Sequence, residues 1–182
     1  MGKALSVKEI YSLVDEIAAS VHRFPVALIG VTRLKSHDNY TYMHSLAVCG
    51  MMVALTSSLG VQRDAIRTAG LAGLMHDVGK ATVDGDILNK PGPLTDLEFE
   101  RMKRHSEAGA TIIIEAGGAT LVADVALHHH ERVDGKGYPH GLSDDAISLL
   151  ARMGAVCDVY DAVTSERVYS ERGIRHEPST RW

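Results

Sequence analysis

The feature with the clearest chemical potential is a histidine directly beside an aspartate, His76-Asp77. Imidazole nitrogens and carboxylate oxygens are both common metal ligands. The pair ends an apolar stretch, and Gly79 and Lys80 follow at once, where a helix would stop. Helix ends often carry polar residues without any metal. The pair alone therefore leaves two interpretations open, a metal site and an ordinary helix end.

More ligand-type side chains lie elsewhere in the chain, most of them in apolar surroundings. They are His44, His105, His128, His129, His130 and Asp158. Each has a plainer explanation when taken singly. His44, close to Leu46 and Val48, is then best interpreted as a core histidine. His37 lies in a polar stretch and is expected to be a solvated loop residue. The set as a whole, and not any one member, indicates metal binding.

Neutral imidazoles and carboxylates together suit iron, manganese or zinc, and the lack of thiolates argues against a structural zinc site. The set is too large for one ion and fits two ions bridged by a carboxylate. Such a pair binds a hydroxide and stabilises an in-line displacement at phosphorus. Asp77 is well placed to bridge, and Lys80 to offer a positive charge to a phosphate oxygen. The alternative for Lys80 is a favourable contact with a helix dipole.

Composition narrows the class of protein. The 182 residues fit one domain with a sizeable core. The formal charge of −4 indicates no general attraction for a nucleic-acid polymer. Cys49 and Cys157 are expected to be buried core residues in a reducing compartment. No secretory signal and no membrane-spanning apolar run is found, so a cytoplasmic location is expected.

Apolar spacing and capping signals predict helices throughout, and no segment shows a convincing strand pattern. A capping box at Ser6 and Glu9 begins the first helix. Thr95 and Glu98 form a second box. Asp64 is expected in the first turn of the helix that ends at His76-Asp77. The other helices are expected at 25–34, 40–59, 96–116, 119–130 and from 143 through 161, with loops at 81–94 and 131–139.

These residues resemble the HD-GYP domain, a branch of the HD metal-dependent phosphohydrolases that degrades the bacterial second messenger cyclic di-GMP. The resemblance rests on His76-Asp77-Val78-Gly79-Lys80 and on His129-His130-Glu131-Arg132-Val133-Asp134-Gly135-Lys136-Gly137-Tyr138-Pro139. It extends from about Asn39 to Arg167. The blocks 87–92 and 105–109 also fit. The second string is highly specific.

The resemblance implies an all-α HD-domain helical bundle with a metal centre on helix faces. It assigns His44, His76 and Asp158 to one metal, and His105, His129 and His130 to the other. Asp77 would bridge two divalent ions, iron or manganese. Lys80 would stabilise charge on the phosphate, and Arg167 would contact a substrate phosphate. His128 is expected to be a neighbour of the ligands and not one of them.

The sequence departs from the family pattern in two places. Some members hold a third metal with a glutamate where this chain has Tyr40, so two metals are expected here. Ser170 replaces a basic residue that usually follows the Arg167 block, and Arg172 is a candidate to compensate. The domain is therefore assigned to residues 1–170, lacking the helices that usually follow, with 171–182 as a polar tail.

The resemblance implies hydrolysis of cyclic di-GMP to pGpG, or further to GMP, by a metal-bridging hydroxide. The alternatives are a module that binds cyclic dinucleotide or partner proteins with little turnover, and a hydrolase for another cyclic dinucleotide. Gly137, Tyr138 and Pro139 are expected to shape substrate placement or to contact protein partners. A homodimer is also allowed. If the loop shapes the site, Gly137→Val should lower hydrolysis and leave metal content near normal.

Overall fold

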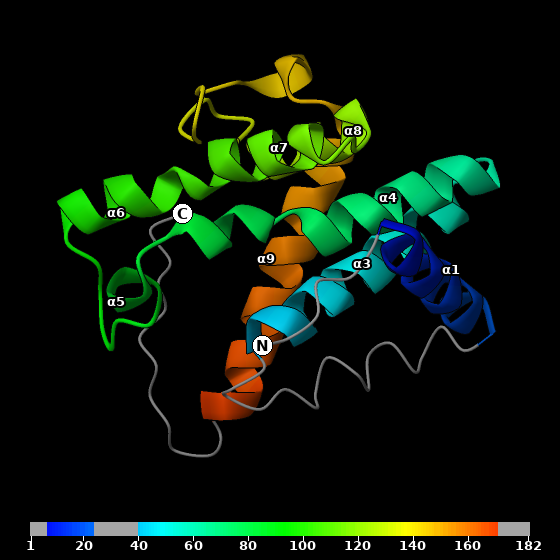
Figure 1. Ribbon diagram of the computed structural model, residues 1–182, viewed down its shortest axis with the longest axis horizontal. Helices are drawn as coiled ribbons and strands as arrows, with labels where there is room; N and C mark the ends of the chain where they lie inside the picture. Colours follow the sequence, from blue (N-terminus) through cyan, green and yellow to red (C-terminus); the bar gives the residue numbers. More distant parts are fainter. Residues whose placement is uncertain (1–6, 24–39, 171–182) are drawn as a thin grey trace.

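The computed structural model describes residues 7–23 and 40–170, in which every regular element is a helix (Figure 1). The longer helices are α1 (Val7–Arg23), α3 (Tyr40–Ser58), α4 (Arg63–Met75), α6 (Asp96–Lys103), α7 (His105–Glu115), α8 (Thr120–His128) and α9 (Leu149–Ser170). The shorter ones are α5 (Gly85–Leu88) and 3-10 helices at Val78–Thr82 and Asp144–Ala146. The predicted all-α fold is confirmed. The Ser6 cap, the helix expected at 25–34 and the tail 171–182 lie outside the described residues.

Helices α3 and α4 pack closely because small residues separate them. A Cβ atom on Gly73 would lie 3.0 Å from the backbone of Cys49, and one on Gly70 would lie 2.7 Å from the side chain of Val53. Only glycine permits this approach. The packing brings the end of α4, and with it His76, beside the N-terminal part of α3, from which His44 projects.

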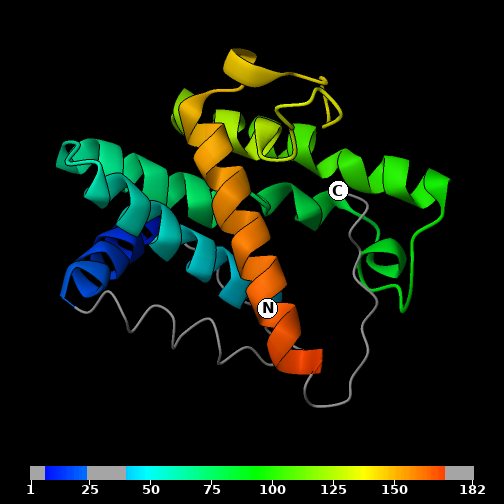
Figure 2. The same ribbon diagram turned by 180° about the vertical axis from the view of Figure 1, so that it is seen from behind.

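Helix α9 crosses α3 and α4, behind them in Figure 1 and in front of them in Figure 2, and α7 and α8 lie side by side at one end of it. Two buried apolar clusters hold these layers together. Cys49 belongs to one cluster and Cys157 to the other, and both thiols are free. The prediction that both cysteines are core residues is confirmed.

Several predicted boundaries are wrong. The helix expected at 96–116 is interrupted at Arg104, between α6 and α7. The helix expected to reach residue 130 ends at His128. The region 81–94 contains α5 and the end of a 3-10 helix.

The start of α9 was also predicted too early. Ser143 precedes only a short 3-10 helix, and α9 begins at Leu149. Ser148 starts it, since its hydroxyl accepts a hydrogen bond from the backbone N–H of Ala151 at 3.1 Å. The capping box at Thr95 and Glu98 is present as predicted. The local capping signal thus located the start of α6 correctly but did not locate the start of α9.

Candidate metal centre

Seven predicted ligand residues converge in the space between α3, α4, α7, α8 and α9. Asp77 is the central one and is buried. Its Oδ1 atom lies 3.4 Å from His105 Nε2 and 3.7 Å from His129 Nε2. Its Oδ2 atom lies 3.3 Å from His76 Nε2 and 3.9 Å from His44 Nε2. The two oxygens of one carboxylate therefore face two different pairs of histidines.

The remaining two ligand residues complete these groups. Asp158 Oδ1 lies 3.0 Å from His44 Nε2 and 4.0 Å from His76 Nε2. His130 stands with Asp77, His105 and His129 in a set whose donor atoms all lie within 4.8 Å of one another. His44, His76 and Asp77 form a second such set. A third such set joins His76, His129 and Asp158, which come from both groups. The seven side chains therefore converge, and their division between two metals stays a prediction.

Three of the histidines are oriented by the ends of helices. His76 Nδ1 lies 2.8 Å from the carbonyl oxygen of Gly73, and His105 Nδ1 lies 2.7 Å from that of Met102. His129 Nδ1 lies 3.0 Å from the carbonyl oxygen of Ala126. The last carbonyls of a helix lack partners within the helix, so each can accept this N–H. Donation from Nδ1 leaves the lone pair on Nε2, which faces Asp77.

The interruption at Arg104 now has a structural reason. His105 is the first residue of α7, and it reaches back to a carbonyl of the last turn of α6. An uninterrupted helix would engage that carbonyl with the backbone N–H four residues later. The break thus makes a helix end available where a ligand must be oriented.

His44 lies within α3, where no such carbonyl is available, and it uses a side chain instead. Its Nδ1 atom lies 2.6 Å from Oδ2 of Asp161, a fully buried carboxylate on α9. Sequence reasoning placed Asp161 on this helix but gave it no role. The spacing of three residues from Asp158 was the available signal, because it places both carboxylates on one helix face.

The surroundings of these groups shift their pKa values and so set their protonation states. Burial raises the pKa of Asp77, but the charges of Lys80 and His76 outweigh it and hold the pKa well below its usual range. Burial lowers the pKa of His105 to about 4, which leaves the imidazole neutral. Burial also lowers the pKa of His44, but hydrogen bonds to Asp158 and Asp161 raise it overall, to about 9. A metal at His44 therefore competes with a proton.

Several candidate metal-ligand atoms of the cluster are buried without a hydrogen-bond partner. They are the Nε2 atoms of His76, His105 and His129 and the Oδ1 atom of Asp77. A buried polar group without a partner costs roughly 1–3 kcal/mol. Three such nitrogens around one carboxylate, with an oxygen of the carboxylate itself, fit a site that divalent metal ions complete. The donor set, imidazole and carboxylate without thiolate, matches the chemistry expected from the sequence.

Lys80 contacts the centre directly. Its Nζ atom lies 2.6 Å from Asp77 Oδ2, and its side chain is 29% exposed. Burial lowers the pKa of Lys80, but Asp77 raises it overall, so the ammonium keeps its charge. The contact is with the predicted bridging carboxylate.

The loop after His130 is packed against the centre. The Tyr138 ring stacks on the His130 ring with centroids 4.7 Å apart, and its backbone N–H donates to the His130 carbonyl oxygen at 3.2 Å. A Cβ on Gly137 would lie 2.5 Å from that same carbonyl oxygen. Pro139 follows within the same turn. The loop therefore supports a ligand, and Gly137→Val is now expected to disturb metal content as well.

Glu131 closes this loop and was not singled out from the sequence. Its buried carboxylate accepts hydrogen bonds from the backbone N–H groups of His140 at 2.6 Å and Leu142 at 2.9 Å. His128 points away from the ligand sets, toward Asp124 and His140. The side chains of Tyr40 and Arg167 lie outside the described part of the structure, so their predicted roles stay predictions.

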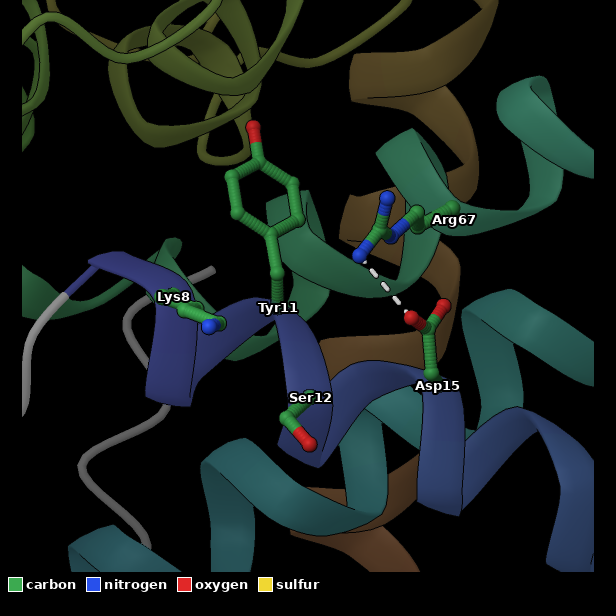
Figure 3. Close-up of a pocket in the computed structure, with 5 residues that line it drawn as sticks. All are labelled: Lys8, Tyr11, Ser12, Asp15 and Arg67. Carbon is green, nitrogen blue, oxygen red and sulfur yellow. Dashed lines mark hydrogen bonds and ion pairs between the residues drawn. The ribbon is translucent and has the colours of Figure 1, made fainter.

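The shallow hollow between α1 and α4 is separate from this centre (Figure 3). It is lined by Lys8, Tyr11, Ser12, Asp15 and Arg67. Arg67 binds Asp15 at 2.8 Å, and its guanidinium lies 4.5 Å from the centre of the Tyr11 ring. The arginine is therefore already engaged by the neighbouring helix, and none of the seven ligand residues lines this hollow.

Comparisons with known proteins agree with this geometry. Residues 28–177 match the sequence model of the HD domain. The chain is 56% identical over 172 residues to the cyclic di-GMP phosphodiesterase PA4108 of Pseudomonas aeruginosa, covering 94% of this chain and 42% of that protein. It is 35% identical over 144 residues to the 3'3'-cGAMP-specific phosphodiesterase 1 of Vibrio cholerae, covering 79% of this chain and 33% of that protein.

A solved structure shares the fold. Bd1817, an HDG"Y"P protein from Bdellovibrio bacteriovorus, superposes with a TM-score of 0.72 at 18% identity, covering 96% of this chain and 61% of that one. The chain spans less than half the length of the Pseudomonas aeruginosa and Vibrio cholerae phosphodiesterases described above. Among the described helices, none has the length and apolar character needed to cross a bilayer.

Proposed function

Because the chain belongs to the HD domain family, we propose that it is a metal-dependent phosphodiesterase that hydrolyses cyclic di-GMP to pGpG, and further to GMP. The HD-GYP resemblance of its motifs is confirmed by the family match and the relatives. The observation that carries the proposal is the position of Asp77. One buried carboxylate whose two oxygens face two histidine groups is what a pair of ions at a phosphodiesterase centre needs.

The described side chains supply two sets of ligands in this proposal. His44, His76 and Asp158 hold one ion, His105, His129 and His130 hold the other, and Asp77 contacts both. Iron or manganese suits these donors. Such ions supply Lewis acidity and an activated water at neutral pH. The chain itself contributes the fixed orientation of the imidazoles, the ionised state of Asp77 and the burial of the ligand side chains.

Lys80 and the loop act on the substrate side. The Lys80 ammonium keeps its charge beside Asp77, and we propose that it donates to an oxygen of the scissile phosphate. Arg167 is proposed to bind a second phosphate. Gly137, Tyr138 and Pro139 are proposed to set the shape of the pocket mainly through His130, on which Tyr138 stacks.

The names of two relatives give different cyclic dinucleotides as the substrate. The protein that is 56% identical is named a cyclic di-GMP phosphodiesterase, and the one that is 35% identical is named specific for 3'3'-cGAMP. The greater identity supports cyclic di-GMP.

A cytoplasmic location, a homodimer and contacts of the loop 137–139 with partner proteins are further parts of the proposal. The alternative function is a signalling module with little turnover.

The test is an assay of the purified chain under reducing, anaerobic conditions, with metals counted first. We expect two metal ions per chain and conversion of cyclic di-GMP to pGpG or GMP, faster than conversion of 3'3'-cGAMP. Asp77→Asn should abolish turnover and lower the metal count. Asp64→Asn, the same change at an exposed site in the first turn of α4, should alter neither.

The outcomes separate the alternatives. A fully metallated, folded chain that binds cyclic di-GMP without hydrolysing it would contradict the enzymatic proposal and support the signalling module. Preferential hydrolysis of 3'3'-cGAMP would contradict the substrate assignment alone. Retained turnover in a folded Asp77→Asn protein would remove the bridging carboxylate from the mechanism.

A further inference from the structure

A second histidine cluster lies outside the buried centre, where the loop that follows His130 passes the end of α8. His128 Nε2 lies 3.1 Å from His140 Nδ1, and the two ring centroids are 5.3 Å apart. His140 is exposed, and the side chain of His128 is 14% exposed. The pair is therefore accessible from solvent, unlike the ligands around Asp77. It brings together two imidazole nitrogens that lie twelve residues apart in the sequence.

The orientation of His128 is set by two further side chains. Its Nδ1 atom lies 2.8 Å from Asp124 Oδ1, and Asp124 Oδ2 accepts a hydrogen bond from the Ser148 hydroxyl at 2.5 Å. A carboxylate that accepts from Nδ1–H leaves the lone pair of His128 on Nε2, the atom that faces His140. Carboxylate–histidine pairs of this kind typically support a metal ligand, fixing its tautomer and raising its basicity.

The charges around the pair favour a cation. Asp124 contributes one carboxylate, and the buried Glu131 accepts from the backbone N–H of His140 at 2.6 Å, which brings a second one close. Arg132, the nearest basic residue in sequence after His128, is held away by two hydrogen bonds to Asp134, at 2.9 and 2.7 Å. No described salt bridge brings Lys or Arg to Asp124.

We propose that His128 and His140 bind a divalent transition-metal ion at the surface, separate from the buried centre. With metal–nitrogen distances of about 2.0–2.1 Å, a nitrogen separation of 3.1 Å corresponds to an angle of roughly 100° at the ion. That angle suits tetrahedral or square-planar coordination completed by water. Imidazole ligands select zinc, nickel or copper(II) over magnesium or calcium.

The bound ion would connect the two ends of the loop at 131–139. His128 ends α8 directly before the ligands His129 and His130, and His140 follows Pro139 at the other end of the loop. Figure 1 shows this loop, in yellow, lying over the ends of α7 and α8. An ion between the two histidines closes the loop onto the helix that carries the ligands. The competing interpretation is a simple N–H···N hydrogen bond at the same distance.

The test counts bound zinc in the full chain and in single variants. Each protein is first loaded with manganese, then incubated with zinc chloride, separated from free metal and analysed for both metals. Any exchange of zinc into the buried centre is common to all the proteins. The wild-type chain should hold one more zinc ion than His140→Asn. Asp124→Asn should bind that ion about 10–100-fold more weakly in a zinc titration.

A matched control distinguishes a built site from general histidine binding. His22→Asn removes an exposed histidine on α1, far from the pair in sequence, and should hold as much zinc as the wild type. Thermal melting confirms that each variant is folded. Equal zinc content in the wild type and His140→Asn would overturn the proposal and leave a hydrogen bond only. Loss of the same ion from His22→Asn would overturn it as well.

Discussion

Gly79 is the residue at which a single added methyl group is predicted to disturb both metal binding and stability. It lies in the 3-10 helix directly after Asp77, and this turn presses against the start of α7. A Cβ at Gly79 would lie 1.9 Å from the carbonyl oxygen of His105 and 2.5 Å from the backbone nitrogen of Gly109. Both atoms belong to the backbone, so no side chain can rotate to make room.

The size of the disturbance follows from these contacts. Ordinary van der Waals contact begins at 3.4 Å, so relief of the 1.9 Å contact requires the two segments to move apart by about 1.5 Å. Metal–ligand distances tolerate only about 0.2 Å. Asp77 lies on one segment and His105 on the other. Gly79→Ala should therefore remove at least one of the two metal ions that these residues are proposed to share.

Stability should fall as well. Overpacking a core typically costs about 1–3 kcal/mol, and a clash with backbone belongs at the upper end. For a domain of this size, about 3 kcal/mol lowers the melting temperature by roughly 6–12 °C. The measurements are metal content, thermal melting and hydrolysis of cyclic di-GMP for Gly79→Ala beside the wild type.

Gly85→Ala is the matched control, because a Cβ there meets nothing within 4 Å. It should keep the wild-type metal content and turnover. The reasoning would be refuted by a Gly79→Ala protein that melts at the wild-type temperature and holds two metal ions. It would also be refuted if Gly85→Ala lost metal to the same extent.

Three other changes have defined outcomes. Asp161→Asn weakens the hydrogen bond that orients His44, so metal affinity should fall about 10–100-fold with the fold retained; an unchanged metal titration would contradict this role. Gly137→Ala should lower metal content and turnover together, since the added Cβ would lie 2.5 Å from the His130 carbonyl oxygen. Reduced turnover with full metal content would instead support direct contact between this loop and the substrate. Hydrogen bonds from Lys90 and then Thr95 lower the pKa of Glu98 from 4.5 to about 2. Its ionised form therefore stabilises the fold above pH 4.5, and this stabilisation is lost as the pH falls toward 2. The melting temperatures of wild type and Glu98→Gln should converge over that range, and a constant difference would contradict the prediction.

The residue types needed for the centre were readable from the sequence. Histidine and aspartate at these positions determine which metals suit the site, and the motif around His76 and the one ending at Pro139 identified the family. Helix starts with a strong local signal, such as Thr95, were also predictable, because a cap acts within one turn.

Other features depend on contacts between distant segments. Asp161 orients His44 across 117 residues, and the break at Arg104 matters only because α7 must present His105 toward Asp77. The break has no local signal, since a helical pattern continues through residue 104. The spacing of Asp161 from Asp158 places both carboxylates on one helix face, but it does not show that His44 lies opposite them. The sequence by itself determined which ligands exist. The packing of five helices decided which nitrogen of each histidine faces inward, because that depends on where a carbonyl or a carboxylate stands behind the ring.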